Sequence, residues 1–279
     1  MSRTFSEGWQ DYELIDAGGA KKLERWGKII TIRPDRNAYF KSEIPFKQWQ
    51  TMAHFEFVED THNKGEWRNL KNAAEEWQIN FNDLVFNLKL TKFKHVGLFP
   101  EQQTNWDFIS KYLKPNQQFL NLFAYTGAAS LVAKKTGADV FHCDSVKQVI
   151  TWARENMELS NLNGIRWVLD DALRFAQKEV KRSHKYDGIV MDPPAFGLGA
   201  KKERWKIENR FPELVKTASE LLSSDGFLII NTYSPRLTEK EIKPIVKQFF
   251  PTKNIEINKL CIKSTSGKVI EYGELTRVW

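Results

Sequence analysis

Four short turns between residues 123 and 197 carry residues that could bind a small polar ligand. The first turn, 123–127 (FAYTG), follows an apolar run, and Gly127 allows the backbone to approach a ligand where a helix begins. The second contains Asp144, which ends the next apolar run. A carboxylate at that position can accept hydrogen bonds from both hydroxyls of a ribose.

The third and fourth turns also carry acidic groups. Asp171 could accept a hydrogen bond from an adenine amino group, or it could cap the helix expected after it. In the fourth turn, Asp192 precedes two prolines that fix φ, so its carboxylate and the neighbouring carbonyls are held in position. Each feature is weak alone, but four such turns in succession favour one shared site.

The elements that position these turns alternate between short apolar runs and helical stretches. Five runs predict strands and five stretches predict helices, in the order strand 119–123, helix 127–137, strand 138–144, helix 146–162, strand 165–169, helix 171–182, strand 186–192, helix 211–222, strand 226–234 and helix 239–250. This order is typical of a parallel sheet with helices on both faces. Two further strands, 254–263 and 269–279, should form a closing hairpin. We therefore expect an α/β fold with a doubly wound, seven-stranded, mostly parallel sheet of the Rossmann-like kind.

The number of glycines in the first turn separates two kinds of ligand. Dinucleotide-binding folds place several glycines there, because a pyrophosphate must lie on bare backbone amides. Gly127 is the only glycine in this turn, 123–127. The pattern therefore favours an adenosine without phosphates over a nicotinamide dinucleotide, and an NAD-dependent oxidoreductase is disfavoured.

Together these residues resemble a known family. The run LNLFAYTGAAS, the acids Asp144 and Asp171, and DPPAFG are similar to the motifs of class I S-adenosylmethionine-dependent methyltransferases. More narrowly, they resemble the bacterial family related to large-subunit ribosomal RNA cytosine-5 methyltransferases. The resemblance covers about residues 90–279, including KHVGLFPEQ at 94–102.

The resemblance implies a set of cofactor-binding residues. Those of the first turn would surround the methionine part of S-adenosylmethionine, those around the second and third turns would hold the ribose and adenine, and the upstream segment would close the pocket. In chain order the residues are Phe99, Gln102, Phe123, Tyr125, Thr126, Gly127, Asp144, Ser145, Asp171, Ala172 and Asp192. No metal is expected.

The chain departs from this family at the residues that would act on a cytosine. The family's cysteine lies just past the fifth strand, where this chain has Tyr233, and Ala195 replaces a lysine of the fourth turn. Cys143 and Cys261 are expected to be reduced core residues. Because carbon-5 of cytosine needs a thiolate adduct before methylation, we expect direct transfer to another atom instead. The expected catalytic residues are Asp192, the Pro193 carbonyl and Phe196, whose ring could stack on a base.

The distribution of charge and the composition of the first 90 residues indicate which kind of partner the protein could bind. The net charge of +7 lies in the second part, because residues 1–90 hold 13 basic against 14 acidic residues and the rest holds 29 against 21. A basic run that could contact RNA follows the fourth turn and comprises Lys201, Lys202, Arg204 and Trp205. Residues 1–90 predict a small β-rich domain that includes a partly helical stretch at 65–80 and that could recognise RNA. Residues 91–279 predict the methyltransferase domain. The tryptophans of the small domain could stack on bases or fill its core.

We therefore expect a cytoplasmic S-adenosylmethionine-dependent methyltransferase acting on a base in RNA, with ribosomal RNA the expected partner. The sequence also allows a protein or a small molecule as the methyl acceptor. A further alternative is a non-catalytic RNA-binding module that retains the cofactor pocket. The protein could also form a homo-oligomer. No apolar run reaches the length of a membrane span, so no membrane partner is expected.

Overall fold

The computed structural model describes residues 2–60, 65–198 and 204–279 and divides the chain into two compact units. The large unit comprises Met1–Thr4, Thr104–Leu260 and Gly273–Trp279, and the small unit comprises Phe5–Gln103 and Cys261–Tyr272. This division differs from the expected boundary at residue 90. The small unit continues to Gln103, and it also takes in the middle of the predicted C-terminal hairpin.

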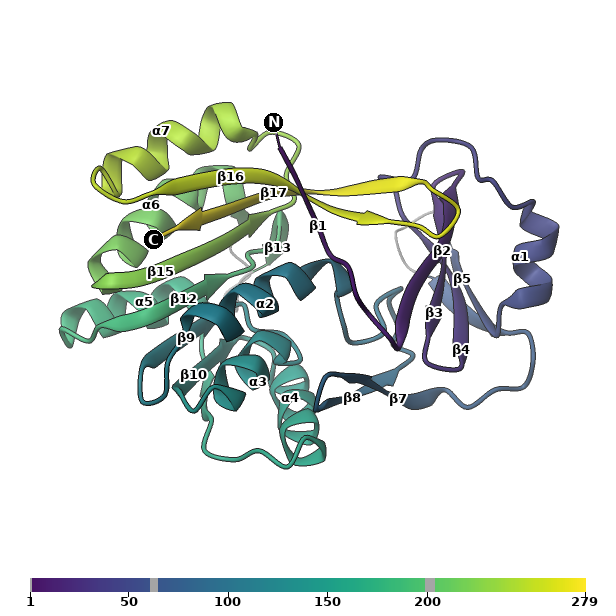
Figure 1. Cartoon of the computed structure of the whole chain (residues 1–279), viewed down its shortest axis with the longest axis horizontal. Coiled ribbons are helices and arrows are strands. Elements are labelled where there is room, and N and C mark those ends of the chain that lie inside the picture. The colour runs from purple at the N-terminus through teal and green to yellow at the C-terminus, as the bar shows by residue number, and fades with distance from the viewer. Residues whose placement is uncertain (1, 61–64, 199–203) are drawn as a thin grey trace. The chain divides into compact units, whose positions relative to one another are not determined.

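The main sheet has the expected doubly wound order (Figure 1). Its strands run β1 (Arg3–Phe5), β16 (Ile255–Lys263), β17 (Val269–Val278), β15 (Leu222–Thr232), β12 (Tyr186–Met191), β9 (Gln118–Leu122), β10 (Asp139–Asp144) and β11 (Arg166–Leu169). The pairs β11–β10, β10–β9, β9–β12 and β12–β15 are parallel, whereas β15–β17 is antiparallel. The seven predicted strands are therefore present, and β1 is an additional edge strand that the sequence did not predict.

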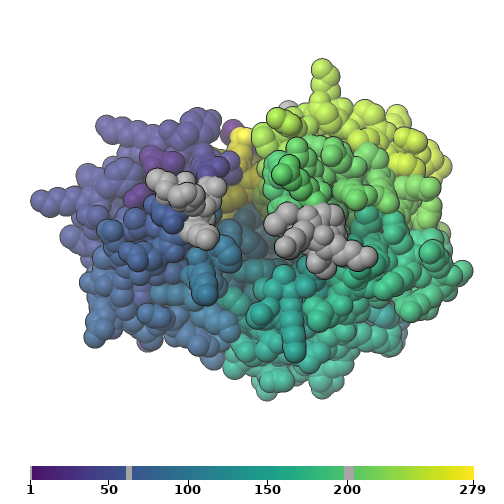
Figure 2. Space-filling view, turned by 180° about the vertical axis from the view of Figure 1, so that it is seen from behind, coloured from purple at the N-terminus to yellow at the C-terminus, as the bar shows by residue number. Residues whose placement is uncertain are grey.

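Helices cover both faces of this sheet (Figure 1). One face carries α2 (Gln103–Tyr112), α3 (Ala128–Lys135) and α4 (Lys147–Leu159), and the other carries α5 (Ala172–Lys181), α6 (Ile207–Leu221) and α7 (Glu239–Phe249). In the space-filling view, green and yellow-green atoms of 207–249 form a continuous part of the surface (Figure 2). Because both faces are covered, the strands read as nearly continuous apolar runs.

The two faces differ in what they bury. Leu120 and Leu122 of β9 and Cys143 of β10 pack into the core shared with α5, α6 and α7. Side chains alternate along a strand, so Asn121 and His142 face the helices on the other side. Both of these polar side chains are buried.

The small unit is built mainly from antiparallel strands. One sheet runs β2 (Tyr12–Gly18), β3 (Lys21–Trp26), β4 (Ile29–Pro34), β5 (Phe55–Glu59) and β6 (Gly65–Asn69), and β7 (Glu76–Phe81) with β8 (Leu84–Lys89) forms a separate hairpin. A helix, α1 (Phe46–Met52), and a 3₁₀ turn, η1 (Pro100–Gln102), complete it.

The expectation of partial helix at 65–80 is wrong. β6 and the start of β7 occupy this stretch, and burial alternates along β7, where Ile79 and Phe81 are buried and their neighbours are exposed. The polar residues that suggested a surface helix are the outward-facing positions of strands. Among the tryptophans, Trp26, Trp49 and Trp106 are core residues.

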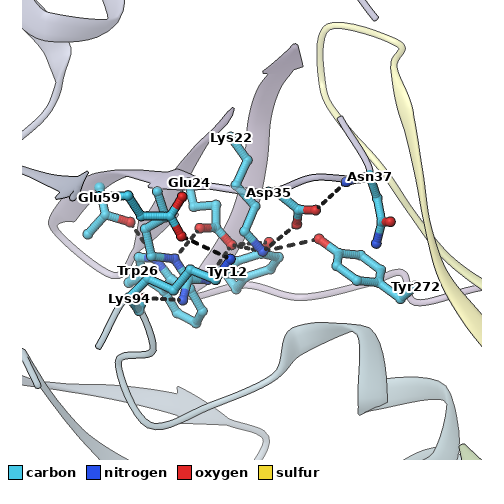
Figure 3. Close-up of polar contacts among 11 residues, drawn as sticks. Tyr12, Lys22, Glu24, Trp26, Asp35, Asn37, Glu59, Lys94 and Tyr272 are labelled. Carbon is cyan, nitrogen blue, oxygen red and sulfur yellow. Dashed lines mark hydrogen bonds and ion pairs between the residues drawn. The ribbon is translucent and has the colours of Figure 1, made fainter. Parts of the chain in front are cut away.

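A buried group of charged side chains holds the small unit together (Figure 3). Arg33 donates to both oxygens of Glu24, at 2.6 and 2.8 Å, and Tyr12 donates to the same carboxylate at 3.0 Å. Lys22 lies 3.3 Å from Glu24 and 3.3 Å from Asp35. Burial alone would raise the pKa of Glu24, but the nearby Arg33 and Lys22 outweigh it and leave the pKa lowered.

None of the helices in the described ranges is long and apolar enough to cross a membrane.

We predict that Arg33→Met lowers the free energy of unfolding by about 3–5 kcal/mol at neutral pH, because it leaves the Glu24 carboxylate buried without its main counter-charge. The difference from wild type should shrink as the pH falls through the lowered pKa of Glu24, because a protonated carboxyl no longer needs the guanidinium. Urea unfolding of the full chain measures both effects.

Arg25→Met, on the neighbouring strand β3, is the matched control. The Arg25–Glu13 pair is about one third exposed, so its loss should cost only about 1 kcal/mol or less. Equal losses for the two variants would contradict a special role for the buried pair.

Candidate active site

Backbone hydrogen bonds join the four predicted turns at one edge of the main sheet. Ala124 N–H donates to the Cys143 carbonyl at 3.1 Å, and Asp170 N–H donates to the Asp144 carbonyl at 3.2 Å. On the other side of β9, Asp192 N–H reaches the Leu122 carbonyl at 3.4 Å. Because β9 lies between β10 and β12, this edge is the point where the strand order reverses, and ligands bind at that point in open α/β sheets.

The first turn has an unusual backbone conformation. Phe123, Tyr125 and Gly127 all have positive φ, at 58°, 49° and 89°. Left-handed conformations at residues other than glycine are uncommon, and they persist where the surrounding structure enforces them. Part of that enforcement comes from Asn156 in α4, whose Nδ2 donates to the Thr126 carbonyl at 3.0 Å. Sequence reasoning missed Asn156, although a polar residue on the buried side of a helix is a signal for it.

Asp144 is held by two backbone donors. Tyr125 N–H donates to Oδ2 at 2.9 Å, and Val146 N–H donates to Oδ1 at 2.9 Å. Burial raises the pKa of Asp144, and backbone hydrogen bonds from Val146, Tyr125 and Ser145 oppose that shift. The two carboxylate oxygens have four lone pairs between them, so the group can also accept hydrogen bonds from ribose hydroxyls. Ser145 follows directly and is exposed.

In the third turn, Asp171 has one of the two roles considered for it, the capping of the helix that follows. Its carboxylate accepts from Arg174 N–H at 2.9 Å and so caps α5, where Ala172 is the first, buried residue. The preceding Asp170 is engaged in ion pairs with Arg174 and, at 2.7 Å, Lys178. A contact of Asp171 with adenine stays a prediction.

The fourth turn leads into a small hairpin that the sequence did not predict. β13 (Phe196–Leu198) pairs antiparallel with β14 (Arg204–Lys206), and Phe196 lies opposite Lys206. The Phe196 ring is 66% exposed, with the Lys206 ammonium 5.5 Å from its centroid. Pro193 is buried and Asp192 is half-buried, so the turn presents a fixed backbone beside an open aromatic ring.

Trp205 holds the fourth turn in place. Its Nε1–H donates to the Pro194 carbonyl at 2.6 Å, and its ring packs against Phe123 at 5.5 Å between centroids. The indole is therefore half-buried rather than a fully open stacking surface. Arg204 is exposed, and the predicted contacts Lys201 and Lys202 lie outside the described residues.

The predicted closing residues Phe99 and Gln102 belong to the small unit. Gln102 is buried, and its backbone N–H donates to the Phe99 carbonyl at 3.0 Å across η1. The Phe99 ring packs against His95 at 5.2 Å. Their contact with a cofactor stays a prediction of the resemblance.

The described residues place no reactive thiol beside the fourth turn. Cys143 is buried within β10, its Sγ is 3.6 Å from the Asp170 carbonyl, and burial raises the pKa of the thiol well above its usual range. Cys261 is buried in the small unit. Tyr233 follows β15, and Ser234 beyond it donates to Glu208 at 2.5 Å. Both cysteines are core residues, as expected.

Comparisons with known proteins agree with this geometry. The family model described as S-adenosylmethionine-dependent methyltransferase matches residues 52–238. A solved S-adenosylmethionine-dependent methyltransferase from Agrobacterium tumefaciens is 33% identical, covers 98% of this chain and 92% of its own, and superposes with a TM-score of 0.92.

Two curated relatives are named for an RNA substrate. Ribosomal RNA large subunit methyltransferase K/L from Syntrophotalea carbinolica is 30% identical over 60% of this chain and 23% of its own length. Ribosomal RNA large subunit methyltransferase K from Neisseria meningitidis is 28% identical over 66% of this chain and 52% of its own length. The chain thus spans between about a quarter and a half of these relatives.

The sheet order, the joined turns around Asp144 and the match over most of the chain lead to one conclusion. The chain belongs to the S-adenosylmethionine-dependent methyltransferase family.

Proposed function

We propose that the chain binds S-adenosylmethionine at the joined turns and transfers its methyl group to a base in RNA, with ribosomal RNA as the substrate class. The observation that carries the cofactor part is the Asp144 carboxylate, which two backbone N–H groups fix at the reversal point of the sheet. In this proposal Asp144 accepts the ribose hydroxyls, Asp171 lies at the adenine, and 123–127 surrounds the methionine part.

The fourth turn would orient the accepting base. S-adenosylmethionine supplies the methyl group of a sulfonium, so the protein mainly has to align the acceptor and receive one proton. The Pro194 carbonyl accepts a hydrogen bond from Trp205, so we assign the acceptor roles to the Asp192 carboxylate and the Pro193 carbonyl. The exposed ring of Phe196 would stack on the base.

Three features support RNA as the acceptor. The curated relatives are named as ribosomal RNA methyltransferases. Lys206 lies opposite the exposed Phe196 and Arg204 lies on the same strand of the hairpin, which suits phosphate neutralisation beside a stacked base. In the small unit, Tyr39 is 86% exposed and Phe93 is 62% exposed, and basic residues precede or follow each of them in the sequence. We propose that this unit also recognises RNA.

The alternatives predict different results in two assays. Transfer of a tritiated methyl group to a protein or small-molecule fraction, and not to RNA, would favour those acceptors. Binding of S-adenosylhomocysteine without transfer to any fraction would favour the non-catalytic module, whereas binding of NAD in its place would favour an oxidoreductase.

We predict that Asp144→Ala weakens the binding of S-adenosylhomocysteine by about 1–3 kcal/mol, because the ribose hydrogen bonds are not made. Isothermal titration calorimetry measures the loss. Asp139→Ala, at the opposite end of the same strand, is the control and should bind as wild type does. Equal affinity of wild type and Asp144→Ala would remove Asp144 from the site.

Asp192→Ala should retain S-adenosylhomocysteine binding yet reduce methyl transfer to RNA by about 100-fold or more, because it removes the proposed proton acceptor. The readout is tritium incorporation into RNA, with mass spectrometry of the digested nucleosides identifying the product. Asp225→Ala, an exposed acid on β15, serves as the control. A fully active Asp192→Ala enzyme would exclude the carboxylate from the mechanism.

Arg204→Gln with Lys206→Gln should weaken RNA binding and reduce the slope of log affinity against log salt by about 0.7 for each charge removed. The matched control neutralises two exposed cations of α6, Arg210→Gln with Lys216→Gln. Filter binding across a salt series measures this slope for each protein. An unchanged slope in the hairpin variant would contradict RNA binding by Arg204 and Lys206.

A further inference from the structure

Three buried polar side chains lie beneath the first turn and have no part in the function proposed so far. They are Asn121 in β9, Ser130 in the first turn of α3 and His142 in β10, and their exposed fractions are 3%, 0% and 0%. They lie on the face of the sheet that α3 covers, opposite the apolar core of α5, α6 and α7. Buried polar groups on such a face are costly unless they bond to one another.

The three side chains form one hydrogen-bonded chain. Asn121 Nδ2 donates to Ser130 Oγ at 2.9 Å, and Ser130 Oγ lies 3.0 Å from His142 Nδ1. The Ser130 hydroxyl has one hydrogen and two lone pairs, so either Ser130 Oγ or His142 Nδ1 can be the donor of the second bond, depending on the imidazole tautomer.

The imidazole stays neutral under ordinary conditions. Burial lowers the pKa of His142 to about 3, and the backbone of Tyr125 opposes this shift only in part. The ring also packs edge-on against Trp167, at 4.9 Å between centroids. The chain of bonds therefore has a single protonation state across the physiological range.

The three hydrogen-bonded side chains come from positions on both sides of the 123–127 turn in the sequence. Asn121 precedes the 123–127 turn and Ser130 follows it, so their hydrogen bond joins the two ends of the turn. His142 lies next to the last residue of the turn, because a Cβ placed on Gly127 would be 3.5 Å from His142 Cε1. The turn held in this way contains the three residues with positive φ.

We propose that Asn121, Ser130 and His142 are positioning residues that clamp the 123–127 turn in the conformation that receives the methionine part of S-adenosylmethionine. This inference rests on the proposed function. It assigns to the clamp the affinity for the amino-acid part of the ligand, whereas Asp144 governs the ribose. Loss of the clamp should therefore affect ligands that carry the amino-acid part and spare those that lack it.

Calorimetry of Ser130→Ala with two ligands tests this assignment. S-adenosylhomocysteine carries the amino-acid part, and 5′-methylthioadenosine has the same nucleoside and sulfur without it. Ser130→Ala removes the hydroxyl that bonds to both Asn121 and His142. We expect this variant to bind S-adenosylhomocysteine more weakly by at least about 2- to 10-fold, the range for one buried hydrogen bond, and to bind methylthioadenosine as wild type does. The ratio should not change between roughly pH 6 and 8, because the clamp does not titrate there.

Two further variants keep the test decisive. Thr217→Val removes a buried hydroxyl from α6, on the other face, and should change neither affinity. Asn121→Ala breaks the same bond from the other side and replaces Ser130→Ala if that variant does not fold. The double variant should lose no more than Ser130→Ala alone, because the bond that Asn121→Ala removes is one of the two that Ser130→Ala removes.

The outcomes are distinct. Equal weakening of both ligands, unchanged affinity for both, or additive losses in the double variant would overturn the clamp while leaving the proposed function intact. If wild type does not bind S-adenosylhomocysteine, the proposed function fails and the clamp fails with it.

Discussion

The hydrogen bond from Tyr125 N–H to the Asp144 carboxylate is the interaction on which the rest of the site depends. It joins the turn after β9 to the end of β10, at 2.9 Å, and it fixes one oxygen of the carboxylate that we propose accepts the ribose hydroxyls. The same bond fixes the amide of a residue with positive φ. This contact therefore links the proposed sugar-binding acid, which Val146 N–H also holds, to the backbone that we propose faces the remainder of the ligand.

The sheet makes this contact available. β9 and β10 are parallel and adjacent, so the turns that follow them leave the sheet at the same edge. The reversal of strand order at β9 places the Asp192 turn on the other side of the same edge. The proposed cofactor and acceptor sites thus follow from strand order, and the hairpin of β13 and β14 adds the cations and the exposed ring.

Much of this arrangement was predictable from the residues, and the exceptions have physical causes. The parallel strands were predictable because burial on both faces makes them apolar throughout. The β13–β14 hairpin was missed because two three-residue strands show no periodicity, and 65–80 was misread because outward-facing strand residues are as polar as those of a surface helix. The clamp was missed, although the polar residues Asn121 and His142 interrupt the apolar runs FLNLF and VFHCD in the sequence.

A crystal structure of the chain with S-adenosylhomocysteine tests the central claim most directly. Both ribose hydroxyls should lie within hydrogen-bonding distance of the Asp144 oxygens, with the amino-acid part of the ligand against 123–127. A ligand bound elsewhere, or a ribose turned away from Asp144, would contradict it.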